Sequence, residues 1–530
     1  MFQSAKECFL TFSINLVFFL SFSHQLYAQE LELAGHLSYA PLTLAGCWHY
    51  VDNNGGEWAL VGTKAGMSIV DVNNPEQPVE RFKVPGIQNN WREMTTWNGF
   101  AYVGSEAVLS GVTIVDLRQL PDTIMYKTWL GDAAHDTTVV KSHALKAADG
   151  YLYIFGAATL TNGAIIADLS DPWNPEIIGT YTTEYVHDGY IRGDTLWTSE
   201  IYKGQFGVVD VSDKANPKLL QTQPTPGAFN HNTGLSDDGQ YLFTADERVS
   251  APLGAFDVAN LDNITLLDTY LPTRKPEGEV HNVRVFGDFL VNACYRGQLT
   301  IVDASRPENL IETAWDSLGN SLVWDVDPYL PSGIILATAK SEGLYIYRKP
   351  PYSHACWLEG TVSDFETGFP LSGTKVFVLN TFNADTSSAD GGYKTGNALP
   401  GIFEVYVEKE GYIPKTISNV QLKTNEVIHL DIQLSQLVQS KQPGLKDLVK
   451  VSPSPFSDYV QIKIAADKFP NHTFSIRMFD QNGHLVHEKI EVSDHEIKLE
   501  NLQKLPVGAY WLSVETENEH IGIFPLIKLQ

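Results

Sequence analysis

A short phrase recurs along the first part of this chain and constrains its fold more than any other feature. Two or three apolar residues are followed by an aspartate and then by a turn rich in Asn, Asp, Ser and Pro. The six aspartates are Asp71, Asp116, Asp168, Asp210, Asp257 and Asp303. Their separations of 45, 52, 42, 47 and 46 residues match the length of one four-stranded blade of a β-propeller.

A second phrase keeps the same period and opens each unit with Trp or His. The seven openings are Trp48-His49, Trp91-Arg92-Glu93, His143, His187-Asp188, His231-Asn232, His281-Asn282 and Trp324-Asp325. Each opening is followed by a short strand, a turn of Gly, Asp or Asn, and a second apolar strand. With a degenerate closing phrase at Leu344–Tyr347, these units predict a seven-bladed β-propeller over residues 29–352.

The last unit predicts how the ring of blades closes. After Leu344–Tyr347 the chain turns at Lys349-Pro350-Pro351, so the seventh blade lacks its outer strand. Residues 31–37 precede the first unit and have the apolar residues of a strand. We expect this segment to pair with Leu344–Tyr347, because the pairing buries an edge that would otherwise invite aggregation.

The charge of the chain limits the partners that it can bind. The chain has 63 acidic and 37 basic side chains, which gives a formal net charge of −26. A charge of this sign repels phosphate backbones, so we expect no nucleic acid partner and no affinity for anionic membranes. We also expect no transmembrane helix, because no stretch of the mature chain reaches the ~20 apolar residues that a spanning helix needs.

The N-terminus has the pattern of a secretory signal peptide over residues 1–28. Lys6 precedes an apolar run over residues 9–22, and Leu26-Tyr27-Ala28 offers a cleavage site before Gln29. The mature protein is therefore expected to leave the cytoplasm.

Three cysteines remain after removal of the signal peptide: Cys47, Cys294 and Cys356. An odd number allows at most one disulfide within the chain, and Cys47 with Cys356 is the pair that flanks the first module. Three small buried thiols are the preferred interpretation.

The sequence changes character after residue 352. Residues 353–435 contain short alternating strands with Gly turns, which predicts a small β-sandwich. Residues 436–448 are polar and without periodicity, so we expect a linker. Residues 449–530 contain further short strands and predict a second sandwich. The expected fold class is all-β, with a seven-bladed β-propeller followed by two small β-sandwich domains.

These motifs resemble three known families. The Ile/Val-Val-Asp phrase with its Asn/Ser-Pro turn is similar to the LVIVD repeat, and the openings resemble the choice-of-anchor B family of secreted bacterial propellers. Residues 357–435 resemble the carboxypeptidase regulatory-like domain. Residues 449–530 are similar to the type A C-terminal sorting domain of type IX secretion, through the Pro-x-Pro-Phe start, the hairpin at Asp480–Val486 and the Gly-x-Tyr strand. Ser454 stands where that family commonly has Asn.

The resemblances imply a location but no reaction. The sorting domain implies passage through the periplasm and across the outer membrane by the type IX secretion machinery, followed by removal of the domain. The mature protein would then be secreted or attached to the outer surface of the cell. The regulatory-like domain is usually a spacer or packing partner in such proteins, with sugar binding as the alternative.

The openings are the candidate functional site, because the innermost strand of each blade lines the propeller axis. His143, His187, His231 and His281 occupy equivalent positions on four consecutive blades. We expect the residues that join them in one ring at a channel mouth to be Trp91, Arg92, Glu93, Asp188 and Asp325. Four imidazoles with nearby carboxylates can hold Zn²⁺, Mn²⁺ or Fe²⁺, or can transfer protons. Four acids at the ends of the following strands are expected around the other mouth or in the loops: Glu106, Glu200, Asp246 and Glu247.

A structural role for these histidines is the interpretation that the sequence favours. A metal needs ligand nitrogens at ~2.0–2.1 Å, so three side chains must converge, and an arc around a channel need not converge. A histidine at a strand start can instead bond the backbone of its own or the next blade. The six repeat aspartates are expected to accept backbone N–H bonds in the turns that follow them.

The sequence contains no standard catalytic or nucleotide-binding motif and no calcium loop. The preferred hypothesis is a secreted or cell-surface propeller that binds a protein or a glycan. The alternative is a metal-dependent hydrolase or lyase that uses His187, His231 and His281 with Asp188. A structural component of a surface layer is the third hypothesis. No cofactor is required by the sequence, and a divalent metal ion is the one that the ring of histidines would hold.

Overall fold

The computed structural model describes residues 28–132, 137–157, 161–437, 448–470, 472–481, 483–516 and 520–529. All of the expected signal peptide except Ala28 lies outside these residues, as do residues 438–447 of the expected linker. The chain divides into two units, Met1–Gln436 and Leu437–Gln530. In the described residues the regular structure is β, apart from the 3₁₀ turns η2 (Leu261–Asn263) and η4 (Leu502–Lys504). Neither is long and apolar enough to cross a membrane.

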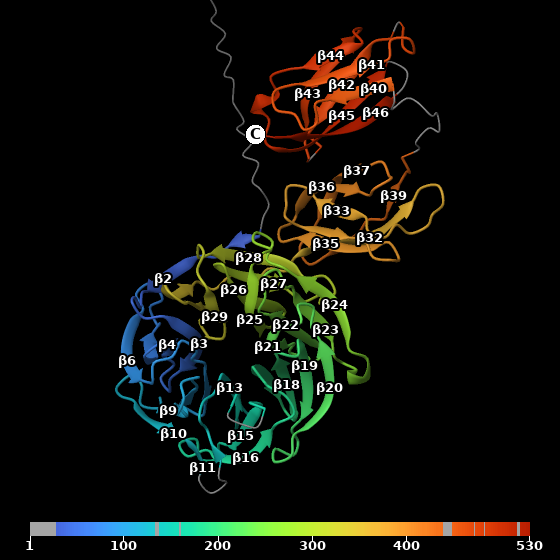
Figure 1. The fold of residues 1–530 in the computed structure, drawn as a ribbon. Coiled ribbons are helices and arrows are strands. Elements are labelled where there is room, and N and C mark those ends of the chain that lie inside the picture. Colours follow the sequence, from blue (N-terminus) through green and yellow to red (C-terminus); the bar gives the residue numbers. More distant parts are fainter. Residues whose placement is uncertain are drawn as a thin grey trace, which may run out of the picture. The chain divides into compact units, whose positions relative to one another are not determined.

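Seven four-stranded blades surround a central axis, with the first strand of each blade innermost (Figure 1). The first two blades are β3 (Leu44–Val51), β4 (Glu57–Thr63), β5 (Gly66–Asp71) and β6 (Val79–Pro85), then β7 (Met94–Trp97), β8 (Phe100–Val103), β9 (Val112–Asp116) and β10 (Met125–Trp129). The third and fourth are β13 (Ala144–Ala148), β14 (Tyr151–Phe155), β15 (Ala164–Asp168) and β16 (Glu176–Tyr181), then β17 (Asp188–Arg192), β18 (Thr195–Glu200), β19 (Gln205–Asp210) and β20 (Lys218–Pro224). The short strands β11 (Gly131–Asp132) and β12 (Thr137–Thr138) pair with each other outside the blades.

The remaining blades complete the ring. The fifth and sixth are β21 (Asn230–Leu235), β22 (Tyr241–Asp246), β23 (Leu253–Asp257) and β24 (Thr265–Tyr270), then β25 (Glu279–Phe286), β26 (Phe289–Tyr295), β27 (Gln298–Asp303) and β28 (Ile311–Ser317). The seventh is β29 (Val323–Asp327), β30 (Ile335–Ala339), β31 (Gly343–Tyr347) and the N-terminal strand β2 (Leu33–Leu37). The fold class predicted from the repeats is therefore confirmed.

The N-terminal strand closes the ring as the sequence predicts. Strand β2 pairs antiparallel with β31, with Leu33 opposite Tyr347 and Leu37 opposite Leu344. A second strand, β1 (Gln29–Glu30), adds to the sixth blade by pairing parallel with β28. The sequence did not indicate this addition. The two ends of the propeller are thus held together by main-chain hydrogen bonds, which leaves no open seam between the first and last blades.

The repeat aspartates hold the turns between the third and fourth strands of the blades. In each of the six copies a carboxylate oxygen accepts a hydrogen bond from the backbone N–H two residues later. For example, Asp168 Oδ1 accepts from Ser170 N at 2.6 Å, and Asp303 Oδ1 accepts from Ser305 N at 2.9 Å. This Asx-turn geometry explains why the phrase keeps Asp at that position. The structural role predicted for these residues is confirmed.

The core of the propeller lies between neighbouring blades. One buried cluster joins Trp58, Leu60 and Ile69 of the first blade to Ala101 and Val115 of the second. Equivalent clusters join the other blades, so each blade buries both faces except at the outer strand. The three cysteines Cys47, Cys294 and Cys356 are buried and unpaired, which agrees with the preferred interpretation.

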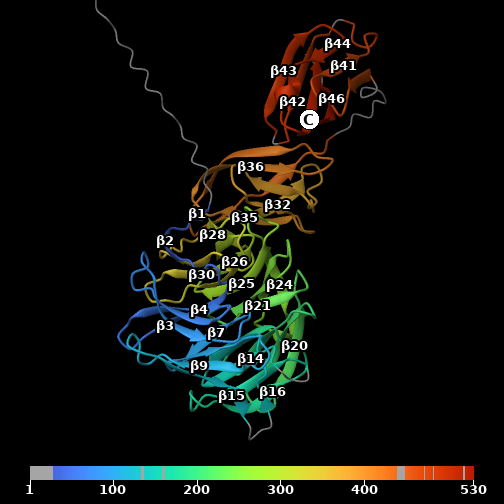
Figure 2. The same ribbon diagram turned by 60° about the vertical axis from the view of Figure 1, so that its left-hand side comes forward.

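Two sandwiches follow the propeller, each made of two sheets. In the first, whose layers are visible in Figure 2, one sheet has β35 (Gly392–Asn397), β32 (Cys356–Asp364), β38 (Val427–His429) and β39 (Ile432–Leu434), and the other has β34 (Ala384–Thr386), β33 (Lys375–Val378), β36 (Gly401–Glu408) and β37 (Lys415–Leu422). In the second, one sheet has β40 (Val449–Ser452), β41 (Val460–Ile464) and β44 (Glu496–Leu499), and the other has β43 (Leu485–Val492), β42 (Phe474–Phe479), β45 (Gly508–Thr516) and β46 (His520–Lys528).

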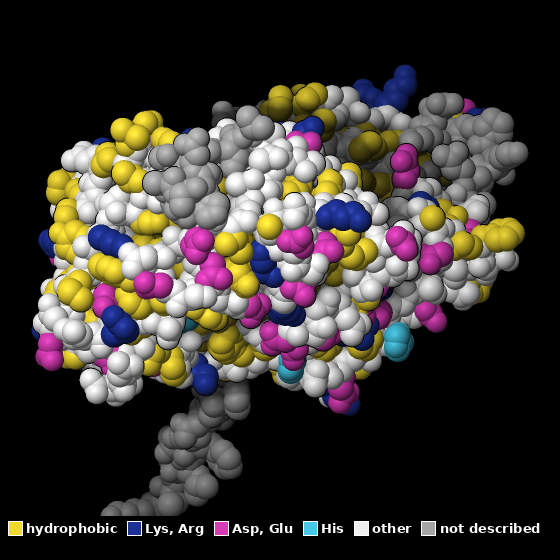
Figure 3. Space-filling model, turned by 90° about the horizontal axis from the view of Figure 1, so that it is seen from below, with side chains coloured by type: hydrophobic (Ala, Val, Ile, Leu, Met, Phe, Trp, Pro, Cys, Tyr) yellow, Lys and Arg dark blue, Asp and Glu magenta, His cyan; other side chains and the backbone are white. Residues whose placement is uncertain are grey.

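On the face that Figure 3 presents, the acidic side chains are interspersed with Lys and Arg and do not gather in one patch.

The closing strand gives a direct test of the ring. A Cβ atom at Gly35 would lie 2.0 Å from the backbone oxygen of Pro75, so Gly35→Val forces β2 away from its place. We expect this variant to lower the free energy of unfolding of the propeller by about 1–3 kcal/mol or more, as overpacking does. Leu33→Thr, which changes a half-exposed side chain of the same strand, is the control. It should lower the free energy of unfolding by less than about 1 kcal/mol. Equal transition temperatures for Gly35→Val and the unchanged protein would contradict this closure.

Candidate metal centre

The innermost strands converge on the axis and bring one residue from each blade to the same level. These seven residues are Gly46, Glu93, His143, His187, His231, His281 and Trp324. Four of them, His143, His187, His231 and His281, form a continuous stack of side chains, here called the histidine row. Consecutive ring centroids in the row lie 3.8, 4.3 and 4.0 Å apart. The chain therefore places imidazoles from four consecutive blades in direct contact at one mouth of the channel.

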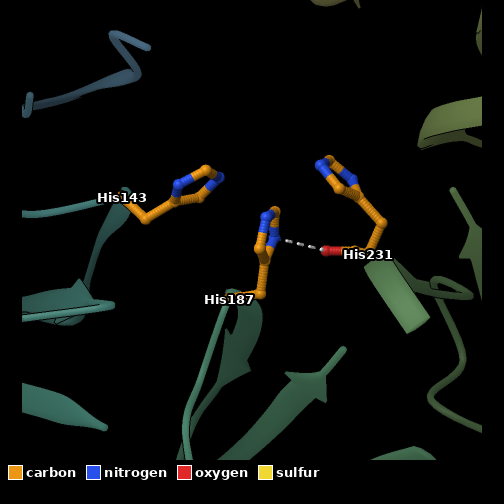
Figure 4. Close-up of side chains that lie close together, drawn as sticks. All are labelled: His143, His187 and His231. Atoms are coloured by element: carbon orange, nitrogen blue, oxygen red, sulfur yellow. Dashed lines mark hydrogen bonds between the residues drawn. The ribbon is translucent and has the colours of Figure 1, made fainter. Parts of the chain in front are cut away.

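The ligand nitrogens of the histidine row converge. Figure 4 shows His143, His187 and His231 from three neighbouring blades with their rings directed toward one another. Ligand atoms of these three residues all lie within 4.8 Å of one another. A second group that shares His231 meets the same limit and consists of His231, Glu247 and His281. The row thus brings together enough ligands for a metal ion, which the sequence alone could not establish.

Three of the imidazoles are oriented by hydrogen bonds at Nδ1. His143 Nδ1 lies 2.7 Å from Glu106 Oε1, His187 Nδ1 lies 3.3 Å from the carbonyl oxygen of His231, and His281 Nδ1 lies 2.5 Å from that of Trp324. Since a carbonyl or carboxylate oxygen accepts, Nδ1 carries a proton in each case, and Nε2 is the ring nitrogen left for a further partner. Metal-binding histidines in proteins are commonly supported in this way.

Burial favours the neutral form of three histidines of the row. Burial lowers the pKa of His187 and His281 well below the usual 6.5, and the neighbouring imidazoles lower both values further. Burial also lowers the pKa of His231, although the carboxylate of Glu247 partly opposes this effect. Neutral imidazole is the form that binds a metal ion, so these residues are ready to bind at neutral pH without losing protons.

Two acids that support the row lie at the ends of second strands. Glu106 follows β8 and contacts His143, while Glu247 follows β22 and lies 3.9 Å from His231 Nε2 and 3.7 Å from His281 Nε2. The sequence placed both acids at the other mouth or in the loops. They lie in the loops after these strands, at the same mouth as the row and not the other one, because the second strand runs antiparallel to the first and ends where the first begins. That geometry is the signal that could have identified them.

Glu93 lies at the same level as the histidine row, on the other side of the channel. Its carboxyl accepts a hydrogen bond from Trp324 Nε1 at 2.8 Å and passes over Gly46, where a Cβ atom would lie 2.2 Å from Glu93 Oε2. Burial, together with the negative charge of Asp325, raises the pKa of Glu93 to about 8. Glu93 is therefore protonated at neutral pH, unlike an ordinary carboxylate.

Asp188 and Asp325 lie one level below the histidine row and do not join it. Asp188 accepts a hydrogen bond from Asn232 at 2.6 Å, and Asp325 accepts from Asn282 at 2.9 Å and forms an ion pair with Arg284 at 2.7 Å. These contacts link neighbouring blades. The two aspartates therefore hold neighbouring blades together along the channel wall.

Cationic side chains cross the channel below the row. Lys146 of the third blade and Arg284 of the sixth both contact the ring of Trp48 in the first, at 4.9 and 5.7 Å from its centroid. Burial lowers the pKa of Lys146, whereas the negative charges of Asp188 and Asp325 raise it. These contacts connect three blades across the channel.

Trp91 and Arg92 take different positions from those that the sequence suggests. Trp91 lies at the rim with 39% of its surface exposed, and Lys340 Nζ lies 5.7 Å from its ring centroid and 4.4 Å from that of Trp324. Arg92 is buried and directs its guanidinium between the first two blades, where it bonds the carbonyl oxygens of Thr63 and Ile87. Arg92 therefore does not contribute to the ring around the channel.

Comparison with known families agrees with this architecture. Four segments match the model of the LVIVD repeat: residues 55–85, 141–183, 202–225 and 277–314. Residues 358–435 match the carboxypeptidase regulatory-like domain, and residues 450–523 match the secretion system C-terminal sorting domain. The propeller thus contains segments similar to the LVIVD repeat, and the chain ends in a region similar to a secretion sorting domain. A search of curated proteins finds no match.

The sorting domain fixes the destination of the propeller. It indicates export through the secretion machinery, so the LVIVD-repeat propeller is secreted or displayed on the cell surface. The histidine row of the mature protein therefore lies outside the cell.

The neutral row predicts how stability depends on pH in metal-free protein. The folded pKa values of His187, His231 and His281 lie below 6.5, so below that pH the unfolded chain binds protons that the folded chain does not. The contribution of these histidines to the free energy of unfolding is therefore fully present above pH 6.5. It is lost as the pH decreases, by up to ~1.4 kcal/mol per pH unit for each histidine. His187→Gln should reduce this slope in chemical denaturation between pH 6.5 and 5. His429→Gln, at an exposed position of the first sandwich, should leave it unchanged, and equal slopes for all three proteins would contradict the prediction.

Proposed function

We propose that this protein is an exported binding propeller. The histidine row would hold a divalent metal ion at the channel mouth, and the ligand would bind to that ion. The observation that carries the proposal is the convergence of three imidazoles, two of which have Nδ1 already bonded. His143, His187 and His231 would supply three nitrogen ligands, with Glu247 and His281 beside them. Such a set suits Zn²⁺ and leaves a coordination position for a ligand.

The rim around this site favours a glycan as the ligand. The ring of Tyr202 is 75% exposed and lies 4.9 Å from that of Tyr185, which in turn contacts His187. Trp91 stands on the opposite side of the mouth beside Lys340. Exposed aromatic rings can stack on the apolar faces of sugar rings, and sugar hydroxyl oxygens can complete the coordination of a metal ion. A protein ligand is the competing outcome of the binding experiment below.

A metal-dependent hydrolase or lyase is the second candidate. Glu247 favours it, since this carboxylate lies within 4 Å of two imidazoles at the same mouth and could accept a proton from a bound molecule. Glu93, which stays protonated at neutral pH, could supply one. A bound glycan that is cut would yield new reducing ends for a hydrolase or unsaturated ends for a lyase, whereas a binding protein returns it intact.

Metal content tests the proposed centre. Full-length protein without an affinity tag, loaded with zinc and dialysed, should retain about one ion per chain by elemental mass spectrometry. His187→Ala/His231→Ala should lose it, because two of three nitrogen ligands are removed. The matched control His429→Ala/His484→Ala removes two exposed imidazoles outside the propeller and should retain the ion. Substoichiometric metal that is the same in all three proteins would refute the centre.

Binding of oligosaccharides tests the ligand class. A glycan array should identify at least one oligosaccharide that binds the zinc-loaded protein and is released by a chelator. Tyr202→Ala should weaken that binding about tenfold, equivalent to ~1.4 kcal/mol, because it removes an exposed stacking surface. Tyr126→Ala, an exposed tyrosine of β10, serves as the control and should bind normally. If the metal-loaded protein binds no glycan and instead captures a surface protein, the glycan hypothesis is wrong and the ligand is a protein.

A further inference from the structure

Arg92 is a buried cation without a partner of opposite charge. Only 2% of its surface is exposed. Its Nε donates to the carbonyl oxygen of Thr63 at 3.0 Å, and Nη2 donates to that of Ile87 at 2.7 Å. Within the described residues Nη1 makes no hydrogen bond. The guanidinium is thus fixed by two neutral acceptors, with one of its amino groups available.

Other buried arginines of the propeller are neutralised. Arg284 forms an ion pair with Asp325 and Arg274 with Glu312, each at 2.7 Å. Arg92 forms no ion pair in the described part of the chain, and burial alone lowers its pKa to about 10. It therefore remains charged at neutral pH. An unpaired buried charge is costly, so a bound counter-ion would stabilise this region.

A small cavity adjoins the free side of this guanidinium. It has a volume of about 60 Å³ and lies between the end of the first blade and the loop after β8. Polar side chains that line it with Arg92 are Ser105, Ser110, Thr113 and Thr128. Gly86 stands against Nη1, since a Cβ atom there would lie 2.9 Å from it.

Two of the hydroxyl groups retain protons that they can donate. Ser105 Oγ accepts a hydrogen bond from Ala107 N at 3.2 Å, which leaves its own proton free. The Thr113 hydroxyl makes no hydrogen bond to any residue that the structure describes. The cavity thus combines one buried cation with neutral donors, and none of its lining residues is acidic. This donor set suits an anion rather than a metal ion or a neutral ligand.

We propose that this cavity is a binding site for a small inorganic anion, held by Arg92, Ser105 and Thr113. The site is separate from the histidine row and does not depend on a metal. Chloride and tetrahedral oxyanions such as phosphate share the required chemistry, which is compact negative charge that accepts several hydrogen bonds. A bound anion would join the first two blades, because Arg92 follows the first blade and Ser105 follows β8 of the second.

Anion-dependent stability tests the proposal in the full-length protein. Thermal unfolding is measured in sodium chloride, sodium phosphate and sodium gluconate at equal ionic strength, with gluconate as the anion too large for the cavity. Chloride or phosphate should raise the transition temperature of the propeller by a few degrees (about 2–4 °C) over gluconate. A response to chloride alone identifies a halide site, and a response to phosphate alone identifies an oxyanion site.

Variants separate this site from general salt effects. Ser105→Ala/Thr113→Val keeps the arginine and should lose most of the anion-dependent shift, as should Arg92→Met. Arg118→Met, which removes an exposed arginine of the second blade that pairs with Asp116, is the matched control and should keep the full shift. Shifts of equal size in the unchanged protein, the control and the serine–threonine variant would overturn the proposal. So would a bromide-soaked crystal without an anomalous peak beside Arg92 Nη1.

Discussion

Closure of the ring is the constraint on which the rest of this structure depends. Pairing of β2 with β31 holds the first and last blades together, so all seven innermost strands must face a single axis. Residues that are about 45 positions apart in sequence then become neighbours at one level of the channel. The three ring contacts of the histidine row form between neighbouring blades of the closed ring, since no two of its members belong to the same blade.

The chemistry of the mouth follows from this crowding. Burial, together with imidazole neighbours about 4 Å away, lowers the pKa of His187 and His281 and so favours their neutral form. Glu106 and two backbone carbonyls then accept the Nδ1 protons and leave Nε2 for a ligand. The structural and metal-binding interpretations of these histidines are therefore compatible. The same hydrogen bonds that link the blades also orient the nitrogens.

The repeat pattern made the fold predictable, and the site was predictable in part. The spacing of the aspartates determines the blade, and the equivalent histidines determine which side chains meet. The contact of Glu106 with His143 was missed, although an antiparallel second strand that ends where the first begins could have indicated it. The position of Arg92 was also hidden, since a residue beside a channel opening can direct its side chain either to the axis or between blades. Only the backbone geometry decides between the two.

X-ray absorption at the zinc edge tests the central claim most directly, because it reports the atoms bound to the ion. Zinc-loaded protein should give a shell of three imidazole nitrogens at about 2.0–2.1 Å, with the scattering from outer ring atoms that identifies histidine. This result would place the ion within the histidine row. A shell made of oxygen alone, or one with a single imidazole, would contradict the account and would leave these histidines with a purely structural role.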